Sequence, residues 1–247
     1  MRILLLLLFS TYIYAGTIRV AVAANVSYAI KDVIQAFNIE HTNIKVEVNI
    51  GSSGKLAAQI LHNAPYDIFM SADMNYPQYI YNSAKAEFKP KVYARGSLAL
   101  FTKRDNIDLN NTIGNILSKN IKKIAIANAK TAPYGVATKE ALENLQLYSK
   151  LKDKFIYAES IGQTLTYALT AADIAFVAKS SLLSEKLSKY KKGKNWIDVP
   201  QNIYTPTKQG VVLIKESKNR ADAKVFYDYI LSDRAKKIFK KYGYIYR

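Results

Sequence analysis

Short apolar segments typical of buried strands alternate along this chain with segments that have helical periodicity. Residues 18–24 form an apolar run rich in β-branched side chains, which predicts a buried strand. Apolar residues then recur at helical spacing over 29–37, and we expect Asn25 to cap that helix. Over 44–50 apolar and polar residues alternate, which predicts another strand. Strands that alternate with helices predict an α/β fold with mostly parallel sheets.

The same alternation continues to the end of the chain. Further strands are expected at 67–70, 97–102, 124–127, 174–177 and 210–214. Further helices are expected at 56–61, 136–145, from about Gln163, and at 180–187, 220–231 and 233–242. In open α/β sheets, ligands bind beyond the carboxyl ends of the strands, at the loops that begin the helices.

The first fifteen residues have the pattern of an export signal. Arg2 precedes an apolar run over 3–9, and Ala15 is a small residue at a plausible cleavage point. The run is too short to span a bilayer, which takes about 20 residues. We predict a signal peptide at 1–15, cleavage after Ala15 and export of the mature chain. A buried N-terminal strand is the alternative for this segment.

The chain has no cysteine and only two histidines. The absence of cysteine excludes disulfides, zinc–thiolate sites, thiol catalysis and a lipid anchor on an N-terminal cysteine. Two histidines argue against a histidine-rich metal site. We therefore expect no cofactor, no membrane anchor and no catalytic residue.

The net charge is +17, from 36 Lys and Arg against 19 Asp and Glu. Such an excess attracts nucleic acid, acidic membranes or anionic ligands. The export signal argues against nucleic acid. Basic residues are spread along the chain, and the densest runs, 186–194 and 236–241, are interpreted as solvated faces.

Four loops at predicted helix starts share small, neutral, hydrogen-bonding groups. They are Ala24-Asn25, 51–54, 133–135 and 160–162. A helix N-terminus exposes unpaired N–H groups and the positive end of the helix dipole, so it holds an anion without a full positive charge. Two loops lie in each half of the chain, which predicts an anion site in a cleft closed from both sides.

Each loop also has a simpler interpretation. Asn25 can be a helix cap alone, and 51–54 a flexible turn, since it lacks the Gly-Lys-Ser/Thr of a phosphate-binding P-loop. Tyr134 can be a packing aromatic among 19 tyrosines. Ile161 would act through its backbone N–H. The combination of the four loops carries the prediction.

Several stretches resemble the periplasmic molybdate-binding proteins of ATP-driven molybdate transporters. The matching stretches are 22–29, 51–60, 64–73, 133–142, 226–231 and 238–243, so the resemblance covers the mature chain. The most specific are Ser-Ala-Asp at 71–73 and Pro-Tyr-Gly at 133–135 in combination. The resemblance implies a two-lobed type II periplasmic binding protein fold. The implied function is capture of molybdate or tungstate for the membrane permease of an ATP-binding cassette importer, by a monomer.

The resemblance also implies the residues that contact the oxyanion. Asn25 would act with the Ala24 backbone beside it, Ser53 would donate its hydroxyl, and Tyr134 and Ile161 would donate backbone amides. These groups would contact the oxygens of the oxyanion, not its metal atom.

One position departs from the family pattern. Some members add a tyrosine hydroxyl where this chain has Ala178, and the Tyr134 hydroxyl is a candidate replacement. Sulfate and phosphate stay open as alternative ligands.

The resemblance places two lobes in the chain. Residues 16–95 with 206–247 would form one lobe and 96–205 the other, with crossings near 93–95 and 204–207. Closure would follow from bending at these crossings.

Two other functions compete with solute binding. In a secreted hydrolase, Ser53 would be a nucleophile, but no His or Lys base is linked to it by a motif, and Asp67 and Asp73 would form an acid–base pair. In a polyanion binder, the charge and the tyrosines would bind and stack on bases. No basic–aromatic motif supports the second function.

Overall fold

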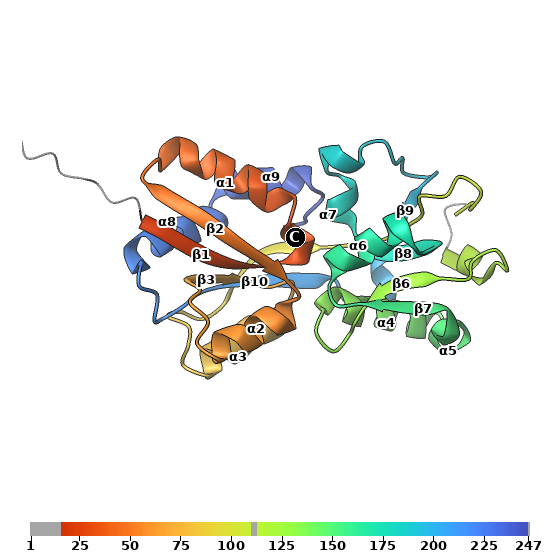
Figure 1. The fold of residues 1–247 in the computed structure, drawn as a ribbon, viewed down its shortest axis with the longest axis horizontal. Helices are drawn as coiled ribbons and strands as arrows, with labels where there is room; N and C mark the ends of the chain where they lie inside the picture. The colour runs from red at the N-terminus through yellow and green to blue at the C-terminus, as the bar shows by residue number, and fades with distance from the viewer. Residues whose placement is uncertain (1–15, 110–112, 247) are drawn as a thin grey trace, which may run out of the picture.

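The computed structural model describes residues 16–109 and 113–246, and in it the chain forms two lobes, each built on a five-stranded sheet. Figure 1 shows the two sheets side by side along the long axis of the molecule. The predicted signal peptide lies outside the described residues. Within the described residues, no helix is long and apolar enough to cross a membrane.

The sheet of the first lobe has the strand order β2-β1-β3-β10-β4. Its strands are β1 (Gly16–Ala23), β2 (Ile44–Gly51), β3 (Ile68–Met70), β4 (Lys91–Gly96) and β10 (Thr207–Leu213). The inner strand β1 is largely buried because apolar side chains on its two faces enter different cores. Ile18, Val20 and Val22 face one core, and Ala21 faces the other.

Helices cover both faces of the first sheet (Figure 1). The first face carries α1 (Ala29–Glu40), α8 (Arg220–Leu231) and α9 (Asp233–Lys241). The opposite face carries α2 (Ser53–Leu61) and α3 (Asn75–Asn82). The C-terminal helices therefore belong to the lobe that begins the chain.

The sheet of the second lobe has the strand order β7-β6-β8-β5-β9. Its strands are β5 (Leu98–Phe101), β6 (Ile124–Ala127), β7 (Phe155–Ala158), β8 (Ile174–Ala178) and β9 (Trp196–Asp198). Its helices are α4 (Pro133–Asn144) on one face, α6 (Ile161–Thr170) and α7 (Lys179–Leu182) on the other, and the short α5 (Tyr148–Leu151). Short 3-10 turns occupy Ala24–Val26, Ile113–Leu117, Lys152–Lys154, Glu185–Leu187 and Gln201–Ile203.

The sheets are mixed, whereas the sequence predicted mostly parallel ones. In the first sheet β1 runs parallel to β2 and β3, but β10 runs antiparallel to β3 and β4. In the second sheet β6 runs parallel to β7 and β8, but β5 runs antiparallel to β8 and β9. The antiparallel strands β10 and β5 are those that enter each lobe from the other one.

Asn25 does not cap the first long helix. It lies in the 3-10 turn Ala24–Val26, and α1 begins four residues later, at Ala29, after Tyr28. The side chain of Asn25 is 1% exposed and forms other hydrogen bonds, described below. Helix α3 and the edge strands β7 and β9 were not predicted.

Candidate anion-binding site

A small cavity lies where the carboxyl edges of the two sets of parallel strands meet. Its volume is about 10 Å³. Pockets for drug-sized ligands measure about 300–1,000 Å³, so this cavity suits only a much smaller solute. Its lining residues are Ala23, Ala24, Asn25, Gly51, Ser52, Ser53, Ala72, Ala132, Pro133, Tyr134 and Ile161.

Strand register brings the first-lobe residues to one edge. Ala23 at the end of β1 is paired with Gly51 at the end of β2, and β3 ends beside them at Met70. Each strand then turns sharply, into the 3-10 turn Ala24–Val26, into α2 and into Ser71-Ala72. The residues that follow these three strands therefore line one wall of the cavity.

The second wall is built in the same way. Ala127 at the end of β6 is paired with Ala158 at the end of β7, and the next helices, α4 and α6, begin at Pro133 and Ile161. Helix α4 approaches its own strand closely, because a Cβ added at Gly135 would lie 2.4 Å from the Ala127 carbonyl oxygen. Only glycine fits there without moving the start of α4.

Every residue that lines the cavity is uncharged. The N-termini of α2, α4 and α6 lie at this cavity. A helix N-terminus has N–H groups without partners in the helix and is the positive end of the helix dipole. Such a cavity favours an anion. It contains no positive side chain that would have to lose its water shell when the anion binds, or that would hold the anion in a tight ion pair when it has to leave.

Two adjacent serines lie at the start of α2. The Ser53 hydroxyl oxygen accepts a hydrogen bond of 3.0 Å from the Ala72 backbone N–H, which leaves its own proton to be donated. Ser52 precedes the helix and is 4% exposed, and its hydroxyl is buried without a hydrogen-bond partner. The sequence analysis selected Ser53 and missed Ser52, because a sequence does not show which way each of two adjacent serines points.

The Asn25 amide is held from behind the cavity. Its Nδ2 donates to Gln209 Oε1 at 3.0 Å and to the Tyr244 hydroxyl at 3.2 Å. Its Oδ1 is buried without a partner. The Asn25 backbone carbonyl accepts from the Ser180 and Tyr244 hydroxyls, each at 2.8 Å. None of these partners was predicted, since all lie more than 150 residues away in the sequence.

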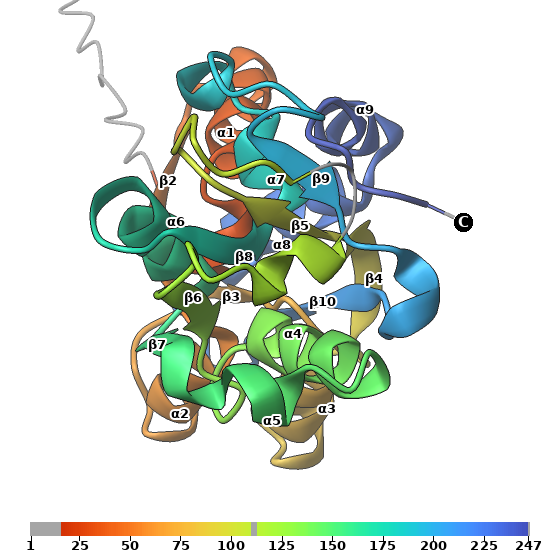
Figure 2. The ribbon, with the colours of Figure 1, turned by 90° about the vertical axis from the view of Figure 1, so that its right-hand side faces the viewer.

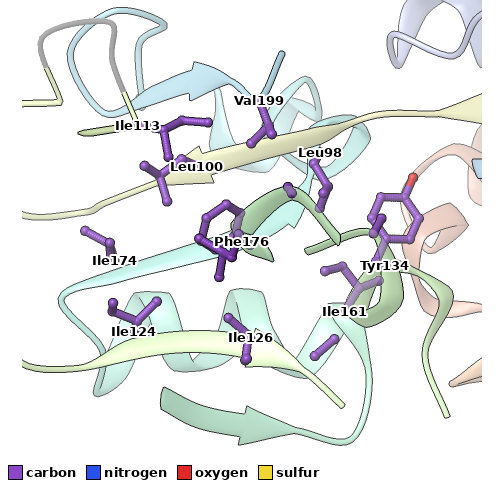
Figure 3. Packing of buried hydrophobic residues seen from close by; sticks show 14 of the residues in the cluster. Leu98, Leu100, Ile113, Ile124, Ile126, Tyr134, Ile161, Ile174, Phe176 and Val199 are labelled. Atoms are coloured by element: carbon purple, nitrogen blue, oxygen red, sulfur yellow. The ribbon is translucent and has the colours of Figure 1, made fainter. Parts of the chain in front are cut away.

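The backbone of Tyr134 lies at the cavity, whereas its side chain points away from it. Its hydroxyl accepts a 3.3 Å hydrogen bond from Gln209 Nε2, and Figure 3 shows it pointing away from Ile161. Burial raises the pKa of the Tyr134 phenol well above its usual value, so the side chain stays neutral. The hydroxyl keeps its own proton for donation, and its role as a replacement for the donor missing at Ala178 stays a prediction.

The position of Ala178 provides a different contact. Ala178 ends β8 and precedes α7, whose Ser180 donates to the Asn25 backbone carbonyl. This bond joins the second lobe to the first directly behind the cavity. The loop that lacks the tyrosine therefore still contributes to closing the two walls.

Further contacts join the lobes around the cavity. Gly54 N–H donates to the Thr131 carbonyl at 2.9 Å. The Lys55 ammonium lies 2.8 Å from a Glu159 carboxylate oxygen, and the Tyr76 hydroxyl donates to the Lys130 carbonyl at 3.3 Å. The lobes are thus closed on each other in this structure.

A family model for bacterial extracellular solute-binding proteins matches residues 18–245. The chain belongs to this family. Among its relatives, the molybdate-binding protein ModA of Rhodobacter capsulatus is 34% identical over 94% of this chain and 89% of its own. ModA of Azotobacter vinelandii is 32% identical over 93% of this chain and 90% of its own.

Solved structures match the fold of this solute-binding protein. The periplasmic molybdate-binding protein of Azotobacter vinelandii aligns with a TM-score of 0.86 and 29% identity, over 93% of this chain and 99% of that one. The sulfate-binding protein of Mycobacterium tuberculosis aligns with a TM-score of 0.75 at 13% identity, over 93% of this chain and 86% of that one, which shows the shared fold alone. The predicted two-lobed α/β fold is confirmed.

The acid–base pair of the hydrolase alternative has structural roles in this solute-binding protein. Asp67 accepts from the Arg19 backbone N–H and from the Ser217 hydroxyl, each at 2.6 Å. Asp73 accepts from the Ser71 hydroxyl at 2.8 Å and from the Tyr76 backbone N–H at 3.3 Å. Neither aspartate lines the cavity, and no group of three metal-ligating side chains is found in the described part of the chain.

Proposed function

We propose that this protein captures molybdate or tungstate in the cavity between its lobes and delivers it to the membrane permease of an ATP-binding cassette importer. The observation that carries the proposal is the chemistry of the cavity. Its lining is neutral, it lies at three helix N-termini, and it contains a hydroxyl and an amide side chain without complete partners. Relatives with about a third of their residues in common are named for molybdate binding.

Binding by this site replaces the water shell of a dianion. Removing that shell is costly unless protein donors take its place. We assign the replacement to the Ser53 hydroxyl, to Asn25 with the Ala24 backbone, and to the backbone amides of Tyr134 and Ile161. The Ser52 hydroxyl joins this set, because it is buried at the cavity and has no other partner.

Release matters as much as capture in a transport protein. An anion held by neutral dipoles leaves when the lobes separate, because no buried ion pair must be broken. We propose that the lobes are 16–95 with 206–247 and 96–205, and that the protein works in the periplasm as a monomer after cleavage at Ala15. No catalytic step is needed for this function.

Titration calorimetry of residues 16–247 with molybdate, tungstate, sulfate and phosphate tests the proposal. We expect one-to-one binding of molybdate and tungstate that is at least tenfold tighter than binding of sulfate or phosphate. Tighter binding of sulfate or phosphate would assign the protein to another oxyanion. Binding of none of the four would overturn the anion site itself.

A further inference from the structure

Gln209 lies behind the anion cavity at the point where the two lobes meet. It is on β10, the strand by which the chain returns to the first lobe, and its side chain is 0% exposed. Helix α4 of the second lobe lies beside β10 (Figure 2). A glutamine in this position is surrounded by protein, so both ends of its amide need partners.

The Gln209 amide connects residues from both lobes. Its Oε1 accepts from Asn25 Nδ2 at 3.0 Å and from the Tyr93 hydroxyl at 2.9 Å. Its Nε2 donates to the Tyr134 hydroxyl at 3.3 Å. Asn25 and Tyr134 are the residues assigned above to the oxyanion from opposite walls. One side chain therefore contacts both of them without lining the cavity itself.

In this arrangement the Asn25 amide is oriented unfavourably for an anion. Gln209 Oε1 and Tyr244 take its NH₂ group, and its Oδ1 remains buried without a partner. An oxyanion such as molybdate has only acceptor oxygens. An amide that contacts it must therefore present NH₂ toward the cavity and turn its oxygen toward Gln209.

We propose that Gln209 is a positioning residue for oxyanion binding, whose amide turns over together with that of Asn25 when the anion enters. In the turned arrangement Gln209 Nε2 donates to Asn25 Oδ1, and Gln209 Oε1 accepts from the Tyr134 hydroxyl. The inference rests on the proposed oxyanion function.

The neighbours of Gln209 permit this exchange. Tyr93 and Tyr134 have hydroxyls, which donate or accept, and burial raises the pKa of both phenols well above the usual value, so both keep their protons. The Tyr93 hydroxyl also has the Ser71 carbonyl at 3.1 Å as an acceptor when Gln209 turns its NH₂ toward it. The contact of Asn25 Nδ2 with the Tyr244 hydroxyl is given up, while that hydroxyl keeps its donation to the Asn25 backbone carbonyl. The Gln209 amide and the two phenols thus keep partners in the turned state, and the Asn25 oxygen gains the one it lacks.

A merely structural role for Gln209 predicts different behaviour. Loss of the side chain would then lower stability and weaken binding independently of Asn25. A positioning role predicts that Gln209 acts through Asn25, so the effects of the two residues on affinity are coupled.

The test is a double-mutant cycle with molybdate as the probe, measured by calorimetry on residues 16–247. We expect Gln209→Met to weaken molybdate binding at least tenfold in the wild-type background and less than threefold in Asn25→Ala. Gln59→Met is the matched control, because Gln59 accepts from the Tyr66 hydroxyl in the first lobe, away from the cavity, and should leave affinity unchanged.

A second measurement needs no variant at residue 209. In ¹⁵N-labelled wild-type protein, molybdate should shift the side-chain NH₂ resonances of both Asn25 and Gln209 and leave those of Gln59 in place. Independent effects in the cycle, or a Gln209 amide that does not respond to bound molybdate, would overturn the inference. Failure of the wild-type protein to bind any oxyanion would instead overturn the proposed function.

Discussion

At the scale of single residues, Ser53 provides the most direct test of the site. Replacing Ser53 by Ala should weaken molybdate binding by about 1–3 kcal/mol, the cost of leaving a buried acceptor unpaired. That is a loss of about 5- to 150-fold in affinity, since about 1.4 kcal/mol corresponds to tenfold. Calorimetry of both proteins gives the difference.

Ser184 is a suitable control for that change. It is 4% exposed, like the site serines, but its hydroxyl donates to the Ser181 carbonyl in the second lobe. Ser184→Ala should alter stability and leave molybdate affinity unchanged. Equal affinities for Ser53→Ala and wild type would remove Ser53 from the site.

Asp73 allows a prediction about pH at the same scale. Burial raises the pKa of its carboxyl, although hydrogen bonds from Ser71 and Tyr76 act in the opposite direction. A folded-state pKa above the unfolded value means that Asp73 favours the fold below the unfolded pKa, about 3.9, and loses this contribution as pH rises through the folded pKa.

Asp73→Asn should therefore raise the free energy of unfolding at pH 7. The amide oxygen still accepts from Ser71 and Tyr76, and no charge has to be buried. The gain should disappear near pH 3, where the wild-type carboxyl is protonated as well. Urea unfolding at both pH values measures it, and a loss of stability at pH 7 would show that the charge itself is needed.

At the scale of elements, the start of α4 positions the Tyr134 amide. Because a Cβ at Gly135 would lie 2.4 Å from the Ala127 carbonyl oxygen, Gly135→Ala must push α4 away from β6. We expect a loss of about 1–3 kcal/mol in stability from the overpacking, together with weaker molybdate binding. Thermal unfolding and calorimetry measure the two effects.

A substitution at the next residue, Val136, distinguishes local strain at Gly135 from a general effect of substitutions in α4. Val136 follows Gly135 in α4, but its side chain is 52% exposed. Val136→Ala should leave both stability and affinity nearly unchanged. If Gly135→Ala behaved in the same way, the close approach of α4 to β6 would not position the site.

The elements also show how much of the fold and of the site can be predicted from the sequence. Strands such as 18–24 and 174–177 could be predicted because nearly all of their residues are apolar and buried, with Arg19 as the exposed exception. The loops after them were therefore placed correctly at the carboxyl edges. The partners of Asn25 could not be predicted, because Gln209 and Tyr244 meet it only after the chain has crossed between the lobes twice.

At the scale of the whole molecule, the charged side chains lie outside the lining of the binding site. The net charge is +17, yet every residue that lines the cavity is neutral. The summed field of a charged protein raises the local concentration of an oppositely charged ligand and accelerates encounter, whereas short contacts determine how long it stays. Salt should therefore affect association and dissociation of molybdate differently.

We expect the association rate constant to fall at least tenfold as the ionic strength rises from about 0.01 M to about 1 M. The screening length shortens over this range from about 30 Å to about 3 Å, so the distant lysines no longer act on the approaching dianion. The dissociation rate constant should change less than threefold, because the helix N-termini and hydroxyls that hold the anion lie inside the closed cavity. Stopped-flow fluorescence with sodium chloride as the salt measures both constants. A dissociation rate that rose with salt as steeply as the association rate fell would show that a charged side chain contacts the anion, and the neutral site would then be wrong.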